Sequence, residues 1–337
     1  TESYILPFYA FQRPEVARNL LLFRYNTLDK ARKNAERMKL DGVLFPWRTI
    51  NGEEASGFFM GSTVQYHINA DIAYAVNLYY QVSRNQEFIE NYGLEILIET
   101  ARMWLSLGSY IPMKDNKFCF NVVCGPDEYK PGVNNNAYTN YMAKFNLKYA
   151  VEVYEKLKDK APERLQEIEK KIDLRLIEIK DWSNAAEKMY LPYNEQLEIN
   201  PQDDSFLYKE EIDIESIPIE ELPLVQNWHP LTIWKYQILK QADVILPMLF
   251  MGDKFSKELK KRMKNITNIL KLRIEIIIYT IRSISHRIQN SIIVAERYFV
   301  YNSGQNFTKF IKLHRRTNAY INLEKMFLIV MIIQLMH

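Results

Sequence analysis

The chain has 337 residues and a mass of 40.1 kDa, enough for one large domain or two ordinary ones. Hydrophobic residues make up 47% and charged residues 25%, a balance that excludes intrinsic disorder and favours a packed core. The apolar stretch 327–333 is shorter than the roughly 18 residues that a membrane span needs, so no membrane association is expected. Two cysteines, Cys119 and Cys124, are too few for a four-ligand zinc site and indicate reduced thiols in a cytoplasmic protein.

Residues 1–256 contain a succession of segments with helical periodicity. Pro14 suits the first turn of a helix, which is expected to break at Asn26-Thr27. Asn69 is expected to cap a later helix, and residues 93–107 carry apolar positions at the i, i+3, i+4, i+7 spacing. The remaining predicted elements are helices over 136–157, 183–189 and 231–250, and a short strand over 117–123.

Long irregular stretches separate these helices, over 40–68, 108–135 and 190–229. Compact helices joined by long loops predict an all-α fold of helical hairpins stacked side by side, with a site built from loops at one end. The sequence has no parallel βαβ pattern, no Gly-rich phosphate loop and no HExxH or GxSxG motif. Their absence argues against the common nucleotide-binding, zinc-protease and serine-hydrolase classes.

Residues 257–337 differ in composition from the rest of the chain. They contain 15 basic and four acidic residues, and they lack Pro, Trp, Asp and Cys. Their aromatic residues do not alternate with basic ones in a stacking pattern, so nucleic-acid binding is not favoured. We interpret this segment as an aberrant basic tail rich in Ile, Asn and Lys, such as an out-of-frame translation would produce.

The stretch FCFNVVCGPDEYKPGVNNNAYTN, residues 118–140, places Asp127 and Glu128 in a loop punctuated by Gly and Pro. A Glu128 carboxyl beside Pro126 and Tyr129, after an apolar run, is expected to be partly desolvated, with a raised pKa. Such a group suits a general acid that protonates the leaving oxygen of a glycosidic bond. Asp127, by contrast, is expected to stay ionised and to accept hydrogen bonds from loop amides. Composition alone favours the alternative, an ordinary turn rich in Asp, Glu, Gly and Pro.

The segment CGPDEYKPGVNNNAYTN resembles the G-P-D-E-Y…NN-x-YTN signature of the glycoside hydrolase family 65 disaccharide phosphorylases, whose members act on maltose, trehalose, kojibiose or nigerose. Residues 45–76 and 228–250 are similar to two further family blocks, in the family's order, and residues 6–32 resemble a fourth. The resemblance covers about residues 1–256 and favours the catalytic interpretation of Glu128 over the ordinary turn.

The resemblance implies a partial (α/α)6 toroid over residues 1–256 and an inverting phosphorolysis of an α-glucosidic disaccharide. Inorganic phosphate is the implied co-substrate, without cofactor or metal, and β-glucose 1-phosphate is the implied product. Because phosphate is already an anion, a phosphorylase can dispense with the base carboxylate by which an inverting hydrolase activates water. The disaccharide and phosphate are therefore the expected binding partners, and no binding of nucleic acid is expected. The parent enzyme is expected to be a homodimer.

Matching positions assign individual roles by resemblance. Glu128 matches the family's proton donor, and Lys240 and Gln241 match a pair that grips the glucose hydroxyls. Trp47 lies in a segment similar to one near the sugar, where an indole can stack on a pyranose ring or pack in the core. The disaccharide itself depends on loop details that this resemblance does not specify.

Other positions are open or depart from the family. His67 is expected to be a buried core or cap residue, with a sugar contact as the alternative. Asp203 and Asp204 are expected to be polar loop residues rather than a catalytic base pair. The family's sugar-binding Trp-Asp pair is missing, and its Ser-rich phosphate loop is only echoed around Ser283 and Ser285. Residues 1–337 are therefore expected to be inactive alone. Two alternatives are a catalytically dead helical remnant and a related inverting α-glucosidase that uses water.

Overall fold

The computed structural model describes residues 1–57, 60–213, 216–222 and 224–269. These residues fall into two compact units. The first comprises 1–211 with 234–237, and the second comprises the described residues of 212–233 and those from 238 onward. Helices dominate the described residues, which confirms the predicted all-α class. None of the described helices combines the length and the hydropathy that a membrane crossing requires.

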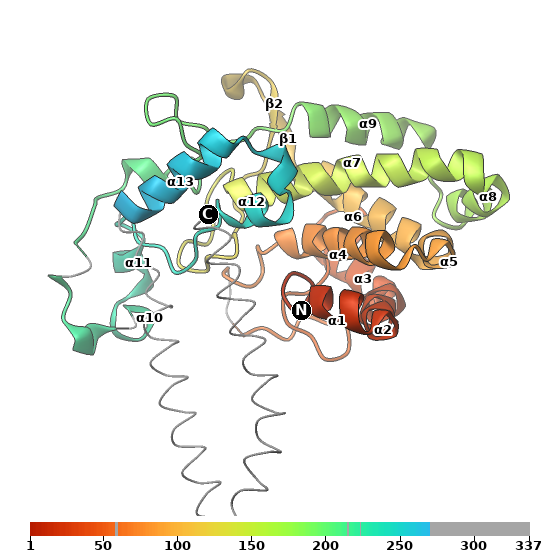
Figure 1. Ribbon diagram of the computed structural model, residues 1–337, viewed down its shortest axis with the longest axis horizontal. Helices are drawn as coiled ribbons and strands as arrows, with labels where there is room; N and C mark the ends of the chain where they lie inside the picture. The colour runs from red at the N-terminus through yellow and green to blue at the C-terminus, as the bar shows by residue number, and fades with distance from the viewer. Residues whose placement is uncertain (58–59, 214–215, 223, 270–337) are drawn as a thin grey trace, which may run out of the picture. The chain divides into compact units, whose positions relative to one another are not determined.

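The elements of the first unit follow one another in the order drawn in Figure 1. Its helices are α1 (Leu6–Gln12), α2 (Pro14–Asn26), α3 (Leu28–Arg37), α4 (His67–Ser83), α5 (Gln86–Phe88), α6 (Leu94–Leu107), α7 (Ala137–Lys160), α8 (Pro162–Lys171) and α9 (Leu176–Glu187). A π-helical turn, η1 (Ile89–Gly93), joins α5 to α6. Two short strands, β1 (Ser109–Ile111) and β2 (Lys117–Cys119), pair antiparallel, with Tyr110 opposite Phe118. The strand predicted over 117–123 is thus confirmed only for its first three residues.

The long helix α7 is the centre of the first unit and packs against α4, α6 and α9 (Figure 1). At the start of α7, Tyr138 donates a hydrogen bond to Asp71, near the start of α4, at 2.6 Å. Near its end, Val153 lines a pocket together with Tyr80, near the end of α4. The two helices therefore run side by side in the same direction.

The helix α6 is apolar around most of its circumference, and it is buried accordingly. Fully buried Trp104 donates its indole N–H to the Asn146 side chain of α7 at 2.9 Å. Ile89, which lies just before α6, meets the far end of α7 at Val153 and Leu157 in the pocket. The helix α6 therefore runs opposite to α7. This alternation of direction is the arrangement that stacked helical hairpins predict.

Several element boundaries follow the sequence predictions, and one helix start does not. The break expected at Asn26-Thr27 separates α2 from α3, and α6 covers all but the first residue of the predicted segment 93–107. The predicted cap Asn69 is wrong, because α4 already begins at His67. Inside the helix, the Asn69 side chain accepts from the Phe45 amide at 3.0 Å and donates to the Val43 carbonyl at 2.7 Å. Asn69 thus fastens the preceding loop to α4.

The single helix predicted over 231–250 is also wrong. Residues 234–237 belong to the first unit, where Tyr236 pairs with Glu210 in a β-bridge. Pro247, in the first turn of the helix that follows, disfavours helical backbone just before it. The predictions for residues 270–337 lie outside the described part of the chain. The described residues of the second unit form the helices α10 (Leu224–Asn227), α11 (Pro230–Ile233), α12 (Leu246–Phe250) and α13 (Lys257–Ile269).

Candidate active site

Hydrogen bonds between the chain segments just before and just after it close the base of the loop that carries Glu128. The Asn135 amide donates to the Phe120 carbonyl at 2.8 Å, and the Phe120 amide donates to Asn135 Oδ1 at 3.1 Å. The amides and carbonyls of Val123 and Val133 exchange a second pair of bonds, at 2.8 and 3.0 Å. Four hydrogen bonds therefore hold the base of the loop formed by residues 124–132.

The helix α7 starts directly behind this loop, and Asn136 fixes its first turn. Asn136 Oδ1 accepts from the amide and the hydroxyl of Thr139, both at 3.0 Å. Asn136 Nδ2 donates to the Gln202 carbonyl at 3.3 Å, and the Ala137 amide donates to the same carbonyl at 2.9 Å. An N-cap side chain of this kind satisfies amides that the start of a helix leaves without intrahelical partners. The Glu128 loop, α7 and the loop around Gln202 are thereby joined.

The two adjacent carboxylates of the loop have different surroundings. Asp127 is 2% exposed, and it accepts hydrogen bonds from the Tyr129 amide at 3.2 Å and from Gln202 Nε2 at 3.1 Å. Glu128 lies in the turn that follows and is only partly buried. Asp127 therefore helps to hold the loop, as the sequence predicted. Glu128 is the more accessible of the two carboxylates.

Lys130, two residues after Glu128, is almost fully buried. Its ammonium nitrogen donates to the backbone carbonyl of Tyr236 and lies 5.7 Å from the centre of the Phe206 ring. Burial, reinforced by the positive charge of Lys209, lowers the pKa of Lys130 to about 7. This buried amine anchors the second half of the loop through its bond to Tyr236.

Asp203 and Asp204 form hydrogen bonds within the neighbouring loop segments. Asp204 accepts from Lys114 Nζ at 3.0 Å and from Asn135 Nδ2 at 2.8 Å. Asp203 Oδ1 accepts from the amide and the hydroxyl of Ser205, at 2.8 and 2.6 Å. These bonds favour the interpretation of both residues as polar loop residues over a catalytic base pair.

A second polar cluster lies where α4 begins. His67 Nδ1 is 3.0 Å from Asp71 Oδ2, and His67 Nε2 is 3.2 Å from Gln65 Oε1. Tyr138 donates to the other oxygen of Asp71, and burial together with the Asp71 charge raises the pKa of Tyr138, which keeps its hydroxyl protonated. His67 is 4% exposed, in agreement with a buried role. Across the described ranges, no group of three or more His, Cys, Asp or Glu side chains could hold a metal ion.

The other predicted site residues are distributed over both units. Trp47 is partly buried in the first unit, and the Arg48 guanidinium carbon lies 4.1 Å from the centre of its ring. A cation therefore already stacks on the indole. Lys240 and Gln241 lie in a bend of the second unit and are partly buried. The structure thus places Trp47 in the same unit as Glu128, and Lys240 and Gln241 in the other.

Three residues of the loop system were not singled out from the sequence. Gln202 bonds Asp127 across 75 residues of chain, and no local pattern predicts such a contact. Lys130 looks like an ordinary surface lysine until the fold buries it. Asn136 had a usable signal, because an Asn directly before a helical segment is a frequent N-cap.

Comparisons with known proteins match this chain over most of its length. The glycosyl hydrolase family 65 central catalytic domain matches residues 1–268. An alpha,alpha-trehalose phosphorylase from Thermoanaerobacter brockii is 52% identical over 262 residues, which are 77% of this chain and 34% of that protein. A kojibiose phosphorylase from Halothermothrix orenii is 39% identical over 278 residues, 78% of this chain and 35% of that protein.

A solved structure of a protein assigned as a kojibiose phosphorylase, from the human microbiome, superposes with a TM-score of 0.73 at 32% identity. It covers 79% of this chain, which covers 39% of that structure. The stacked helices are therefore those of a partial helical toroid, as the sequence predicted. The chain belongs to glycosyl hydrolase family 65. It spans about a third of the length of the curated relatives that it matches.

Proposed function

We propose that this chain supplies the catalytic core of an inverting phosphorylase for an α-glucosidic disaccharide. In this reaction Glu128 protonates the oxygen that leaves, while inorganic phosphate attacks the anomeric carbon and forms β-glucose 1-phosphate. The observation that carries the proposal is the Glu128 loop, which is closed at its base by four hydrogen bonds and keeps Glu128 partly exposed beside a buried Asp127. Relatives named trehalose and kojibiose phosphorylases support the same reaction.

One carboxylic acid suffices for this chemistry. An inverting hydrolase needs a second carboxylate to take a proton from the attacking water. Phosphate attacks as an anion and has no such requirement. The hydrogen bonds of Asp127, Asp203 and Asp204 to loop groups support this division, because they assign these carboxylates to the loops.

Lys240, Gln241 and Trp47 are proposed to bind the sugar. The amide of Gln241 can donate to one hydroxyl and accept from another, whereas Lys240 only donates. Replacing Gln241 with Leu would leave sugar hydroxyls unpaired, at a loss of about 1–3 kcal/mol of binding for each buried group. An unchanged kcat/KM for Gln241→Leu, in the chimera described below, would reject this role.

We propose that the activity belongs to a longer enzyme. Residues 1–337 alone are expected to show no turnover of a disaccharide. The chain spans about a third of its relatives, and phosphorolysis depends on holding phosphate in line with the sugar, where small misplacements cost about 100-fold. We further propose a cytoplasmic enzyme whose parent is a homodimer. Formation of β-glucose 1-phosphate by residues 1–337 with maltose, trehalose, kojibiose or nigerose would overturn the inactivity proposal.

A chimera tests the function directly. Residues 1–256 would replace the matching segment of the Thermoanaerobacter brockii trehalose phosphorylase, to which the chain is 52% identical over 262 residues. The chimera is then supplied with each disaccharide, with and without phosphate. Phosphate-dependent formation of β-glucose 1-phosphate is expected. Release of glucose without phosphate would favour the α-glucosidase, and a folded chimera without turnover would favour the inactive remnant.

A further inference from the structure

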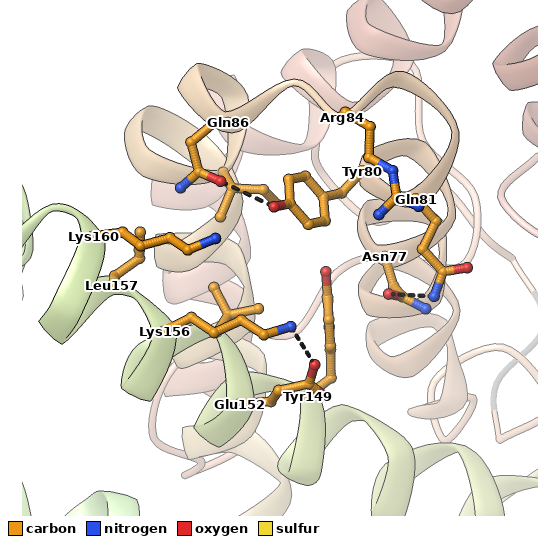
Figure 2. Close-up of a pocket in the computed structure, with 12 residues that line it drawn as sticks. Asn77, Tyr80, Gln81, Arg84, Gln86, Tyr149, Glu152, Lys156, Leu157 and Lys160 are labelled. Carbon is orange, nitrogen blue, oxygen red and sulfur yellow. Dashed lines mark hydrogen bonds and ion pairs between the residues drawn. The ribbon is translucent and has the colours of Figure 1, made fainter.

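A pocket lies between α4 and α7, at the end of these helices opposite the Glu128 loop (Figure 2). Its cavity volume is about 130 Å³, it is partly open to solvent, and it lies entirely within the first unit. Because α7 rises about 1.5 Å per residue, Lys156 lies roughly 30 Å along the helix from the Asn136 cap. The pocket is therefore separate from the candidate active site.

The floor of this pocket contains a buried hydroxyl without a partner. Tyr149 is 5% exposed, and among the described residues its hydroxyl has no hydrogen-bond partner. Figure 2 shows this hydroxyl pointing into the space between the two helices. Burial, followed by the charge of Glu152 and by Tyr80, raises the pKa of Tyr149, so the phenol stays protonated and can donate. A buried donor of this kind normally has an acceptor.

The walls of the pocket are positively charged. Arg84 enters from the end of α4, and Lys156 and Lys160 enter from α7 (Figure 2). Glu152 is the only acidic residue of the lining, and it pairs with Lys156 at 2.6 Å. Three positive charges against one negative charge give the lining a formal charge of +2.

The ends of the two helices explain part of this charge. Cations are favourable near helix C-termini, where backbone carbonyls lack partners, and Arg84 and Lys160 occupy such positions in α4 and α7. Carbonyl groups cannot explain the Tyr149 hydroxyl, however, because none of the described acceptors reaches it. Taken together, the unpartnered donor and the surplus cations favour an anionic acceptor inside the pocket.

We propose that this pocket binds the phosphate group of inorganic phosphate or of a small phosphate ester. A phosphate monoester carries about −1.5 to −2 charges at pH 7, which matches the surplus charge of the lining. Its oxygens can accept a bidentate pair of bonds from Arg84 and further bonds from Lys160 and the Tyr149 hydroxyl. Asn77 and Gln81 of α4, which are hydrogen-bonded to each other at 3.2 Å, also line the pocket and can contact an attached sugar or other polar group. The proposal does not rest on the proposed function.

The test is isothermal titration of the full chain, residues 1–337, with inorganic phosphate, with glucose 1-phosphate and with glucose. The double variant Arg84→Gln/Lys160→Gln is expected to weaken the binding of phosphate-containing probes at least 10-fold, because it removes charge-assisted hydrogen bonds. Tyr149→Phe is expected to weaken it about three- to tenfold. Lys148→Gln, on an exposed part of α7 outside the lining, serves as the control and is expected to leave binding unchanged.

The melting temperature separates binding from folding in the same experiment. Tyr149→Phe removes a buried hydroxyl without a partner, so its melting temperature is expected to equal or exceed that of the wild type. Tighter binding of glucose 1-phosphate than of inorganic phosphate would identify an ester as the ligand, and the reverse order would identify free phosphate. Equal phosphate affinity in the wild type and in both pocket variants, binding of glucose alone, or no binding of any probe would overturn the proposal.

Discussion

Two buried polar side chains along α7, Asn136 and Tyr149, differ in their hydrogen-bond partners. At the N-terminal end, the Asn136 side chain bonds Thr139 and Gln202, and it joins the helix to the loops around Glu128. At the C-terminal end, the Tyr149 hydroxyl is buried without a partner, beneath a positively charged pocket. Burial alone therefore does not identify a functional group. The absence of a partner indicates a place for a ligand only together with a charged pocket, because Asn140 Oδ1, near the start of α7, is also buried without a partner among the described residues.

The largest expected effect comes from Asp71, which accepts bonds from Tyr138 and lies beside His67 at the N-terminal end. Asp71→Leu leaves both buried groups without their acceptor, and we expect a loss of about 3–5 kcal/mol in the free energy of unfolding. Asp29→Leu is the matched control, because the Asp29 side chain is 91% exposed and its ion pair with Arg32 is worth little. Urea denaturation measures both. Equal effects of the two substitutions would show that the cluster at the start of α4 is not structural.

Lys130 gives the loop a pH dependence. Its pKa in the folded protein is about 7, below the ordinary value of 10.5, because of burial. Between these two pH values the unfolded chain binds more protons than the folded one, so the free energy of unfolding rises with pH, by at most about 1.4 kcal/mol per pH unit. Lys130→Met removes this slope, whereas Lys148→Met, at an exposed position, retains it.

The measurement is urea denaturation of the wild type and both variants at about pH 7 and about pH 10. The stability of the wild type relative to Lys130→Met is expected to increase at the higher pH. A difference that stays constant, or decreases, would show that Lys130 titrates as an ordinary lysine.

Asn136 tests the cap of α7. Asn136→Ala removes the acceptor for the Thr139 amide and the donor to the Gln202 carbonyl, and we expect a loss of about 1–2 kcal/mol. Asn136→Ser restores a capping oxygen and is expected to recover part of this loss. Thermal unfolding distinguishes the two variants. If Asn136→Ser is no more stable than Asn136→Ala, the cap is not what holds the start of α7.

Val122 gives the smallest effect. It has φ of +56°, a left-handed conformation that is unfavourable for a β-branched residue, and it is 52% exposed, so few packing contacts are lost on substitution. Val122→Asn is expected to stabilise the chain by about 0.5–1 kcal/mol, because Asn tolerates this conformation. Val122→Ala keeps most of the strain and is expected to gain less. Equal stability of all three proteins would mean that no strain is stored there.

The sequence predicted the helices better than the contacts between loops. Segment 93–107 has a clear apolar period, and it forms α6. The predicted helix over 231–250 failed because residues 234–237 belong to the first unit, where Tyr236 pairs with Glu210, and local periodicity carries no signal of such pairing. Glu128 was accessible to prediction through its motif. The buried states of Asp127 and Lys130 were not, since they depend on Gln202 and Tyr236, which lie far away along the chain.

The role of Glu128 as the proton donor is tested in the chimera that carries Glu128→Gln. Loss of a general acid should slow phosphorolysis of a disaccharide by about 10²–10⁴-fold. The same variant should retain most of its activity on α-glucosyl fluoride, because fluoride leaves without a proton. Glu195→Gln, at an exposed loop position, is the control and should resemble the wild type. Near-normal phosphorolysis of the disaccharide by Glu128→Gln, or equal losses on both substrates, would contradict the assignment.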